Sequence, residues 1–182
     1  LIGPDLTLSL SQRAELMLAR GNISYSDGNA AKALESYKAA LAFIDADPEA
    51  NPRTRARILE QQGKSLMDLG NYDEAEASHQ QANLLYRRYD GEQHFSTGLS
   101  YYNMALLAYN AGRNELAQER IRKSLGIVSR VLDRANPIRA DVLSLQGSIY
   151  IAQGELDRSD RALAGSVSAY MAVYRGPHYN IG

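Results

Sequence analysis

The chain has 182 residues, of which 45% are hydrophobic, and its 20 Lys and Arg nearly balance its 21 Asp and Glu. A net charge of −1 gives no general reason to expect nucleic acid or an anionic membrane as a partner, and no apolar run approaches the roughly 18 residues that cross a bilayer. The absence of cysteine excludes disulfides and thiolate metal sites and fits a reducing compartment, so we expect a soluble, cytoplasmic protein.

Apolar residues recur at three- and four-residue intervals along most of the chain, which is the pattern of amphipathic helices. The opening turn offers Asp5 or Thr7 as the cap of the first helix. No stretch shows sustained two-residue alternation, so the sequence predicts an all-α fold. The expected helices come in pairs joined by a short turn, at about residues 8–25 and 30–46, 54–69 and 72–89, 96–111 and 114–132, and 138–153 and 156–173.

Three positions of the chain repeat with a fixed spacing of 42 residues, as in 63−21 = 42. A fixed period of this size is typical of a solenoid built from one repeated supersecondary unit. The first position lies in the first helix of each pair, the second in the turn and the third early in the second helix. The rows are Gly21, Gly63, Ala105 and Gly147; Gly28, Gly70, Gly112 and Gly154; and Ala33, Ala75, Ala117 and Ser159.

The five prolines, at positions 4, 48, 52, 137 and 177, lie before the first repeat or in the joints between repeats, where a missing N–H does no damage. They support four repeats, at about 8–52, 53–94, 95–136 and 137–178, within a single domain covering 1–182. His178 lies two periods after His94 (178−94 = 84), so we expect a fifth repeat to begin at 178–182. The chain is therefore expected to be a fragment of a longer protein.

The small residues and turn glycines have physical roles. Two helices joined by a short turn approach closely only where the crossing point carries a small residue, such as Gly21 with Ala33. The turn glycine can adopt a positive φ at the end of the first helix. Both roles predict packing rather than chemistry.

This arrangement resembles the tetratricopeptide repeat, whose pattern is matched in the second copy by Gly63, Gly70, Ala75, His79 and Ala82. The usual unit has about 34 residues, and the longer period here is similar to the repeats of kinesin light chains, which also occur in bacterial signalling proteins. The resemblance implies a right-handed α-solenoid of four repeats and about eight helices. It also implies a concave groove, lined by the first helix of each repeat, that binds a peptide.

The resemblance assigns residues to that groove by their positions in the first helices. Amides at Asn22, Gln61 and Asn103 would bond the main chain of an extended peptide, and Tyr102 and Tyr109 would be aromatic anchors. The alternative is that the amides are merely solvated. Basic residues in the second repeat favour a peptide with acidic and apolar side chains. The full set is Asn22, Tyr25, Arg57, Gln61, Lys64, Tyr102, Asn103, Leu106 and Tyr109.

No constellation in the sequence points to catalysis. His79 takes a packing position, and His94 and His178 occupy equivalent joints, where a cap or joint contact explains them without a metal. Gly63-Lys64-Ser65 lies inside a helix with no preceding strand, so it is not a phosphate loop. We therefore expect no enzyme activity, no cofactor and no metal.

The second helix of the third repeat is rich in basic residues. Because acidic residues are interspersed with them, most should form a solvated helix face, and an acidic or nucleic-acid partner is the alternative. The basic residues are Arg113, Arg120, Arg122, Lys123, Arg130 and Arg134.

The leading hypothesis is a non-catalytic scaffold that binds a peptide segment or a partner domain. One alternative is a regulatory domain of a larger bacterial signalling protein, such as a protein kinase or a transcriptional regulator. Another is end-to-end homo-oligomerisation through the last helix, because terminal repeats without a polar cap tend to associate. That helix would present Leu156, Leu163, Val167 and Tyr170.

Overall fold

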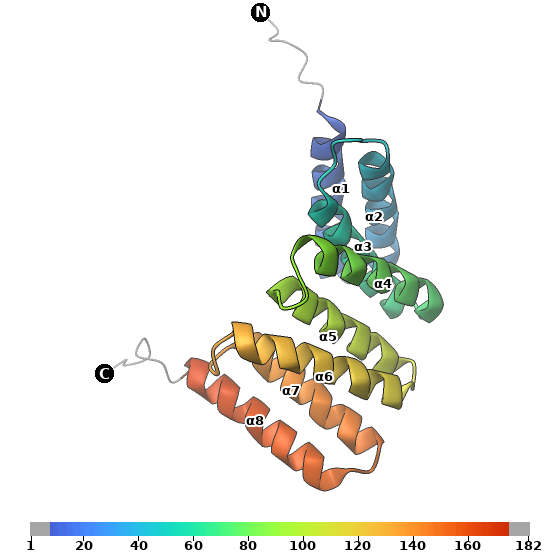
Figure 1. Cartoon of the computed structure of the whole chain (residues 1–182). Helices are drawn as coiled ribbons and strands as arrows, with labels where there is room; N and C mark the ends of the chain where they lie inside the picture. The colour runs from blue at the N-terminus through green and yellow to red at the C-terminus, as the bar shows by residue number, and fades with distance from the viewer. Residues whose placement is uncertain (1–7, 175–182) are drawn as a thin grey trace, which may run out of the picture. The chain divides into compact units, whose positions relative to one another are not determined.

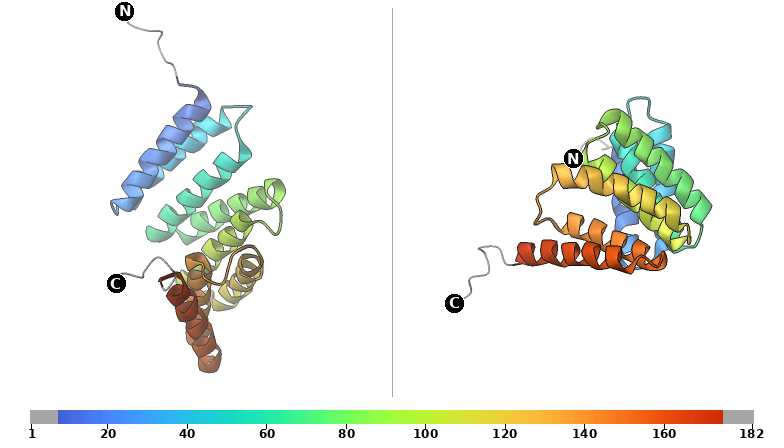
Figure 2. Two further views of the ribbon diagram at one scale, coloured as in Figure 1. Left: turned by 90° about the vertical axis from the view of Figure 1, so that its left-hand side faces the viewer. Right: turned by 60° about the horizontal axis from the view of Figure 1, so that its bottom comes forward.

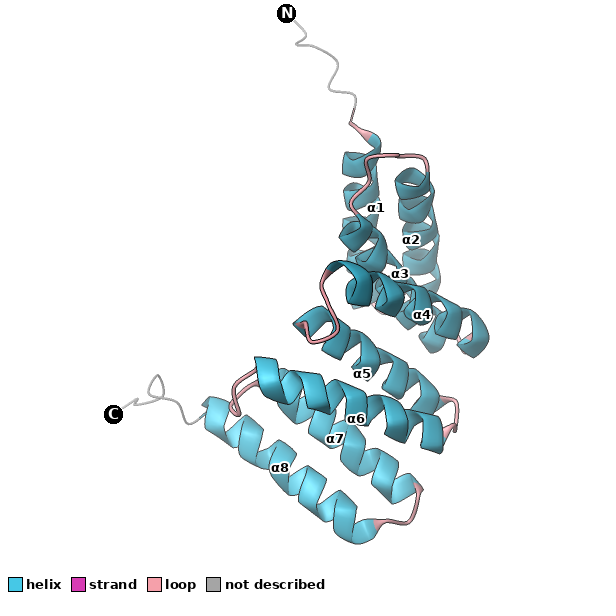
Figure 3. Ribbon diagram, in the orientation of Figure 1, coloured by secondary structure: helices cyan, strands magenta, loops and turns pink. Residues whose placement is uncertain are grey.

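The computed structural model describes residues 8–174, and within that range the secondary structure is eight α-helices with no strand (Figure 1 and Figure 3). The all-α fold predicted from the sequence is confirmed. The proposed fifth repeat at 178–182 lies outside the described residues. The helices are α1 Leu10–Ser26, α2 Ala30–Asp45, α3 Pro52–Asp68, α4 Tyr72–Tyr89, α5 Phe95–Asn110, α6 Asn114–Val131, α7 Pro137–Ala152 and α8 Leu156–Tyr174.

The start of α1 differs from the prediction. Its N-cap is Ser9, whose hydroxyl accepts a hydrogen bond from the Gln12 backbone N–H at 3.2 Å. The Gln12 side chain accepts in return from the Ser9 N–H at 2.9 Å, which completes a capping box. The prediction of Asp5 or Thr7 as the cap is therefore wrong, and both residues lie outside the described range.

Each helical hairpin turns at a glycine in the left-handed region. The φ of Gly28 is +76°, and the other three turn glycines have φ values between +71° and +77°. At Gly28 the N–H of Asn29 donates to the Ser24 carbonyl at 2.9 Å, and the N–H of Gly28 donates to the Tyr25 carbonyl at 3.0 Å. This is a Schellman motif, which satisfies carbonyls at the end of the helix. The role that the sequence predicts for these glycines is confirmed.

Contacts divide the chain into two compact units, one ending at Leu85 and the other beginning at Tyr86. In unit 1, α1 and α2 pack as a hairpin and α3 packs on α2. In unit 2, α5 pairs with α6, α7 pairs with α8, and α6 packs on α7, as Figure 2 also shows. The division falls inside α4 rather than at a predicted joint, and the single domain stays a prediction.

The repeated small residues make room for a large side chain of the second helix. A Cβ added at Gly21 would lie 2.6 Å from Cδ1 of Tyr37, and one at Gly63 would lie 2.7 Å from Nε2 of His79. Both side chains are buried, so the predicted packing role of His79 is confirmed. The side chain nearest to a Cβ at Gly21 is thus that of Tyr37, and the pairing of Gly21 with Ala33 stays a prediction.

Each unit has its own apolar core. In unit 1 the core is formed by Ala14, Leu18, Ala33, Tyr37, Ala40, Ile44 and Ile58. In unit 2 it is formed by Ala105, Ala108, Ala117, Ile121, Val128, Val142, Leu145 and Ile149.

Most basic residues of α6 are exposed, as the sequence predicts, but Arg120 is buried. Its guanidinium donates from Nη1 to the Met104 carbonyl at 3.1 Å. A buried guanidinium must find hydrogen-bond acceptors, so this arginine serves the packing of α5 against α6.

Candidate functional site

The predicted binding residues of unit 1 lie on α1 and α3, and we call their solvent-facing side the first-helix face of unit 1. An ion pair joins the two helices there: a carboxylate oxygen of Glu15 accepts from Arg57 at 3.3 Å and from the Thr54 hydroxyl at 3.2 Å. Arg57 is therefore an exposed cation already partnered within the fold. Glu15 and Arg57 carry opposite charges and are one 42-residue period apart, so they occupy equivalent positions on neighbouring first helices. This spacing could have predicted the ion pair from the sequence.

Asn22 is exposed on α1 and held by a core residue. Its Oδ1 accepts a hydrogen bond from the Tyr37 hydroxyl at 2.9 Å. Tyr37 is fully buried, and this burial raises its pKa to about 12. The bond to the buried ring restrains the amide at Oδ1, and Nδ2 of this exposed residue is the donor that Asn22 can offer to a ligand carbonyl.

Tyr25 lies half-buried near the end of α1 and faces the end of α3. Burial is the largest cause of its raised pKa of about 12, followed by a side-chain hydrogen bond with Asp68. The two residues line an open depression of about 570 Å³ beside the turn that begins at Asp27. Sequence reasoning missed Asp68, because nothing local marks a residue at the end of α3 as the partner of one on α1.

Gln61 and Lys64 lie half-buried on α3. Two neighbouring first-helix positions that the repeat pattern also assigns to this face, Leu18 and Glu60, are only 2% and 7% exposed. The polar side chains that this face presents to solvent therefore include Asn22, Gln61 and Lys64, beside the paired Glu15 and Arg57.

The predicted residues of unit 2 lie on α5. Tyr102, Leu106 and Tyr109 are partly buried and pack against the core of unit 2. Burial raises the pKa of Tyr102, and the negative charge of Asp141 on α7 raises it further. The three side chains form a half-open apolar and aromatic strip, which we call the first-helix face of unit 2.

Asn103 differs from its predicted role. Its side chain is only 5% exposed, so it offers almost no surface to a peptide in this structure. The neighbouring Asp141 is also engaged within the fold, where its carboxylate accepts a hydrogen bond from the Tyr170 hydroxyl. Sequence position alone does not separate Asn103 from Tyr102, because the exposure of two adjacent residues depends on the rotation of α5 about its axis.

The histidine before α5 has a structural role. Nδ1 of His94 accepts from the Ser96 N–H at 3.2 Å and caps α5, which confirms the predicted joint role. His178 lies outside the described residues. No group of three or more His, Asp or Glu within 8–174 is placed to hold a metal ion. Across the same range, no helix is both long and apolar enough to span a bilayer.

Helical hairpins of this kind, with polar and aromatic first-helix faces, define a helical-repeat scaffold. Two family models of the tetratricopeptide repeat match residues 54–128 and 102–164, which together cover more than half of the chain. The chain belongs to the tetratricopeptide repeat family. Repeats of this family are in general non-catalytic, and the family supports a scaffold for protein–protein interaction as the class of function of this chain. A search among curated proteins finds no significant match.

Solved structures show the same fold. BtubC (BKLC) from P. vanneervenii superposes with a TM-score of 0.83 at 19% identity, over 94% of this chain and 68% of that chain. A putative kinesin light chain from Podosopora anserina with nearly identical TPR-like repeats gives a TM-score of 0.72 at 16% identity, over 93% and 81% of the two chains. MamA gives 0.63 at 20% identity, over 87% and 78%. At these identities the similarity establishes the fold alone.

Proposed function

We propose that the chain binds an extended peptide segment of a partner protein on its first-helix faces. The observation that carries this proposal is the fixed presentation of Asn22, whose amide is held by the buried Tyr37. A side chain that is already ordered loses little entropy when a ligand binds. Nδ2 of Asn22 can donate to a peptide carbonyl, and Lys64 lies on the adjacent first helix of the same unit.

The first-helix face of unit 2 supports the same function through different chemistry. Tyr102 and Tyr109 are supported from below by the core, so their rings can contact apolar side chains with few rotamers left to lose. Leu106 lies between them in sequence and adds apolar surface. We propose that each face, taken by itself, binds a peptide segment: polar side chains suit the face of unit 1, and apolar side chains suit the face of unit 2.

The test is selection of binding peptides from a random phage-displayed library, followed by fluorescence polarisation with the selected peptides. Asn22→Ala with Lys64→Ala on unit 1, or Tyr109→Ala on unit 2, should weaken binding roughly tenfold, as truncation of an interface hot spot does. Lys38→Ala on α2 is the matched control, because Lys38 is exposed on a second helix. The proposal would be contradicted if the unit 1 double variant and Tyr109→Ala both bound the peptides as tightly as the unaltered protein, or if Lys38→Ala lost binding.

Self-association through α8 is a second candidate, supported by its exposed apolar side chains. Leu156 is 63% exposed, Val167 55% and Met171 41%. Of the side chains predicted for this surface, Leu163 and Tyr170 are instead half-buried against α7, which leaves a smaller patch. Val167→Glu should abolish any concentration-dependent rise in sedimentation coefficient. A monomer at all concentrations would remove this candidate.

A further inference from the structure

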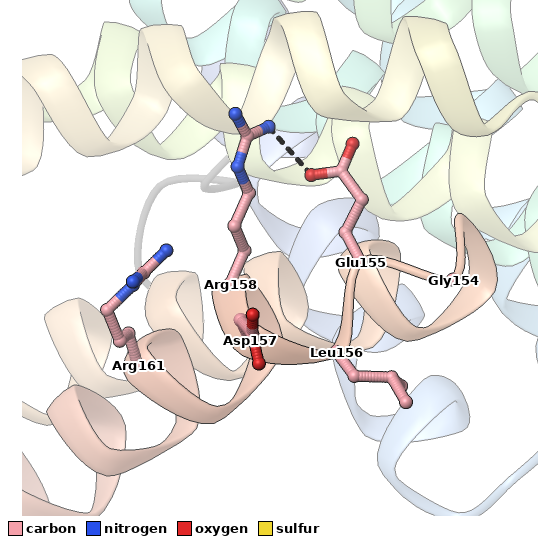
Figure 4. Close-up of a pocket in the computed structure, with 6 residues that line it drawn as sticks. All are labelled: Gly154, Glu155, Leu156, Asp157, Arg158 and Arg161. Atoms are coloured by element: carbon pink, nitrogen blue, oxygen red, sulfur yellow. Dashed lines mark hydrogen bonds and ion pairs between the residues drawn. The ribbon is translucent and has the colours of Figure 1, made fainter.

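A second surface of unit 2, distinct from its first-helix face, is lined by side chains from α6, α7 and α8. It is an open groove of about 550 Å³. We call it the arginine groove and define it by Gln118 and Arg122 of α6, Gln146 and Tyr150 of α7, and Arg158 and Arg161 of α8. Near the start of α8 it shares Arg158 and Arg161 with a neighbouring depression, shown in Figure 4.

The charge in this groove is of one sign. Three guanidinium groups line it, and no Asp or Glu is among the described residues that do so. Arg158 is partly compensated, since its Nη1 lies 2.7 Å from the carboxylate of Glu155. Arg161 lies apart from that pair (Figure 4). The Arg122 side chain donates from Nε to the Gln118 carbonyl of its own helix at 3.3 Å. The hydrogen bond from Lys123 lowers the pKa of the exposed Glu119, and the charge of Arg122 helps to lower it. Within residues 8–174 the terminal N–H groups of Arg122 and Arg161 therefore remain available for an external anion.

The repeat architecture does not require these arginines. The positions 84 residues before Arg158 and Arg161 carry Glu74 and Ala77 (158−84 = 74 and 161−84 = 77). A residue type needed only for stacking one repeat on the next would recur at that spacing, as the small residues do. Arg122 and Arg158 have basic equivalents only in the first repeat, Lys38 and Lys32, and Arg161 has none, so stacking of the repeats does not require a basic residue at any of the three positions.

The polar side chains that line the groove suit a polypeptide ligand. Gln118 is half-buried and presents its amide beside the arginines, whereas Gln146 also lines the groove but is only 8% exposed. Side-chain amides can donate to and accept from a peptide main chain. The guanidinium of Arg158 lies over the ring of Tyr150, 5.9 Å from its centroid, which restricts the position of that cation.

We infer that the arginine groove binds an acidic peptide segment in an extended conformation. Guanidinium groups match carboxylates in bidentate geometry, and the half-buried Gln118 amide can bond the peptide main chain. Nucleic acid fits less well, because binding to phosphates needs a longer basic surface than three side chains and the whole chain has a net charge of −1. This site goes beyond the proposed function, because it lies on different helix faces and selects its ligand by negative charge.

The probe is a fluorescein-labelled octapeptide of alternating Glu and Ala, with the Gln-for-Glu peptide as its matched control. Fluorescence polarisation should show binding of the acidic peptide alone, and binding should fall between 0.05 and 0.5 M NaCl, concentrations chosen to shorten the Debye length to about a third. Arg122→Gln combined with Arg161→Gln should weaken binding about tenfold, from roughly threefold per exposed charge pair. Lys38→Gln is the control, because Lys38 is exposed and lies two periods before Arg122 (122−84 = 38).

A second measurement, by NMR, detects binding that is too weak for fluorescence polarisation. In ¹H–¹⁵N spectra, the acidic peptide should shift the side-chain amide signals of Gln118 and Gln146, and Asn22→Ala on unit 1 should leave these shifts unchanged. The inference is overturned if neither amide signal moves or if the Gln-for-Glu peptide binds as tightly as the acidic peptide. It is also overturned if Lys38→Gln weakens binding as much as the double substitution, or if a single-stranded oligonucleotide binds more tightly than the peptide at 0.15 M NaCl. Loss of peptide binding in Asn22→Ala would place the ligand on the first-helix face instead.

Discussion

Replacing Gly21 by Ala should destabilise unit 1, although alanine is the better helix former. The added Cβ would lie 2.6 Å from Cδ1 and 2.9 Å from Cζ of the Tyr37 ring. Tyr37 is fully buried in the core, so the ring has no open space into which to move. Either the ring or the α1–α2 crossing must shift.

Three contributions set the size of the effect. Inserting a methyl group into a packed site costs about 1–3 kcal/mol. Moving the ring also disturbs the hydrogen bond from the Tyr37 hydroxyl to Asn22, which is worth about 1 kcal/mol. Replacing an interior helical glycine by alanine returns about 1 kcal/mol. The free energy of unfolding should therefore fall by about 1–3 kcal/mol.

Urea unfolding followed by circular dichroism measures this change, and Gly126→Ala is the matched control. Gly126 is exposed inside α6, and a Cβ built there meets nothing within 4 Å, so the same substitution should stabilise the protein by up to about 1 kcal/mol. In a Tyr37→Ala background, Gly21→Ala should lose its cost because the ring is gone. Equal stability of Gly21→Ala and Gly126→Ala would refute the reasoning.

Three further predictions concern single side chains, each measured by urea unfolding. Burial raises the pKa of Tyr37 to about 12, so its neutral form stabilises the fold below pH 10, and this contribution is lost as the pH rises from about 10 to 12. Tyr37→Phe should therefore reduce the loss of stability at alkaline pH. An unchanged pH profile of stability would contradict this. Asn136 caps α7 by accepting from the Ile138 N–H at 3.0 Å, so Asn136→Ala should cost about 1 kcal/mol, and an unchanged urea midpoint would argue against the cap. The buried Ser166 hydroxyl donates to the Ala140 carbonyl at 2.9 Å, so Ser166→Ala should cost about 1 kcal/mol, and no loss would mean that the bond adds nothing net.

The fold could be predicted from the sequence because its determinants are local. A turn glycine with positive φ, such as Gly70, acts through residues within one helical turn, and a 42-residue period repeats that local signal. The sequence predicted less well which large side chain of the second helix packs against each small residue. Gly21 and Tyr37 are 16 residues apart, and their contact depends on how the two helices cross.

The candidate site could be predicted only as a set of positions on the first helices. Whether a side chain on such a helix is exposed depends on its rotation and on neighbouring helices, so Asn103 is buried while the adjacent Tyr102 remains half-open. The arginine groove was not predicted, because its residues are spread over three helices and Arg122 has the sequence pattern of a solvated face. Only the structure brings Arg122 and Arg161 to the same groove.

The repeat period itself separates structural positions from positions that are free to carry specificity. Every equivalent of Gly21 is Gly or Ala, and in the three copies with glycine a large side chain of the second helix lies against this site. The equivalents of Asn22, one residue further along, are Lys64, Leu106 and Ser148, which share no chemistry. Such a position is not constrained by stacking, so selection by a ligand can act on it. Within unit 1 a bound peptide would meet an amide and then an ammonium group, and this order would fix the direction of the peptide on that face.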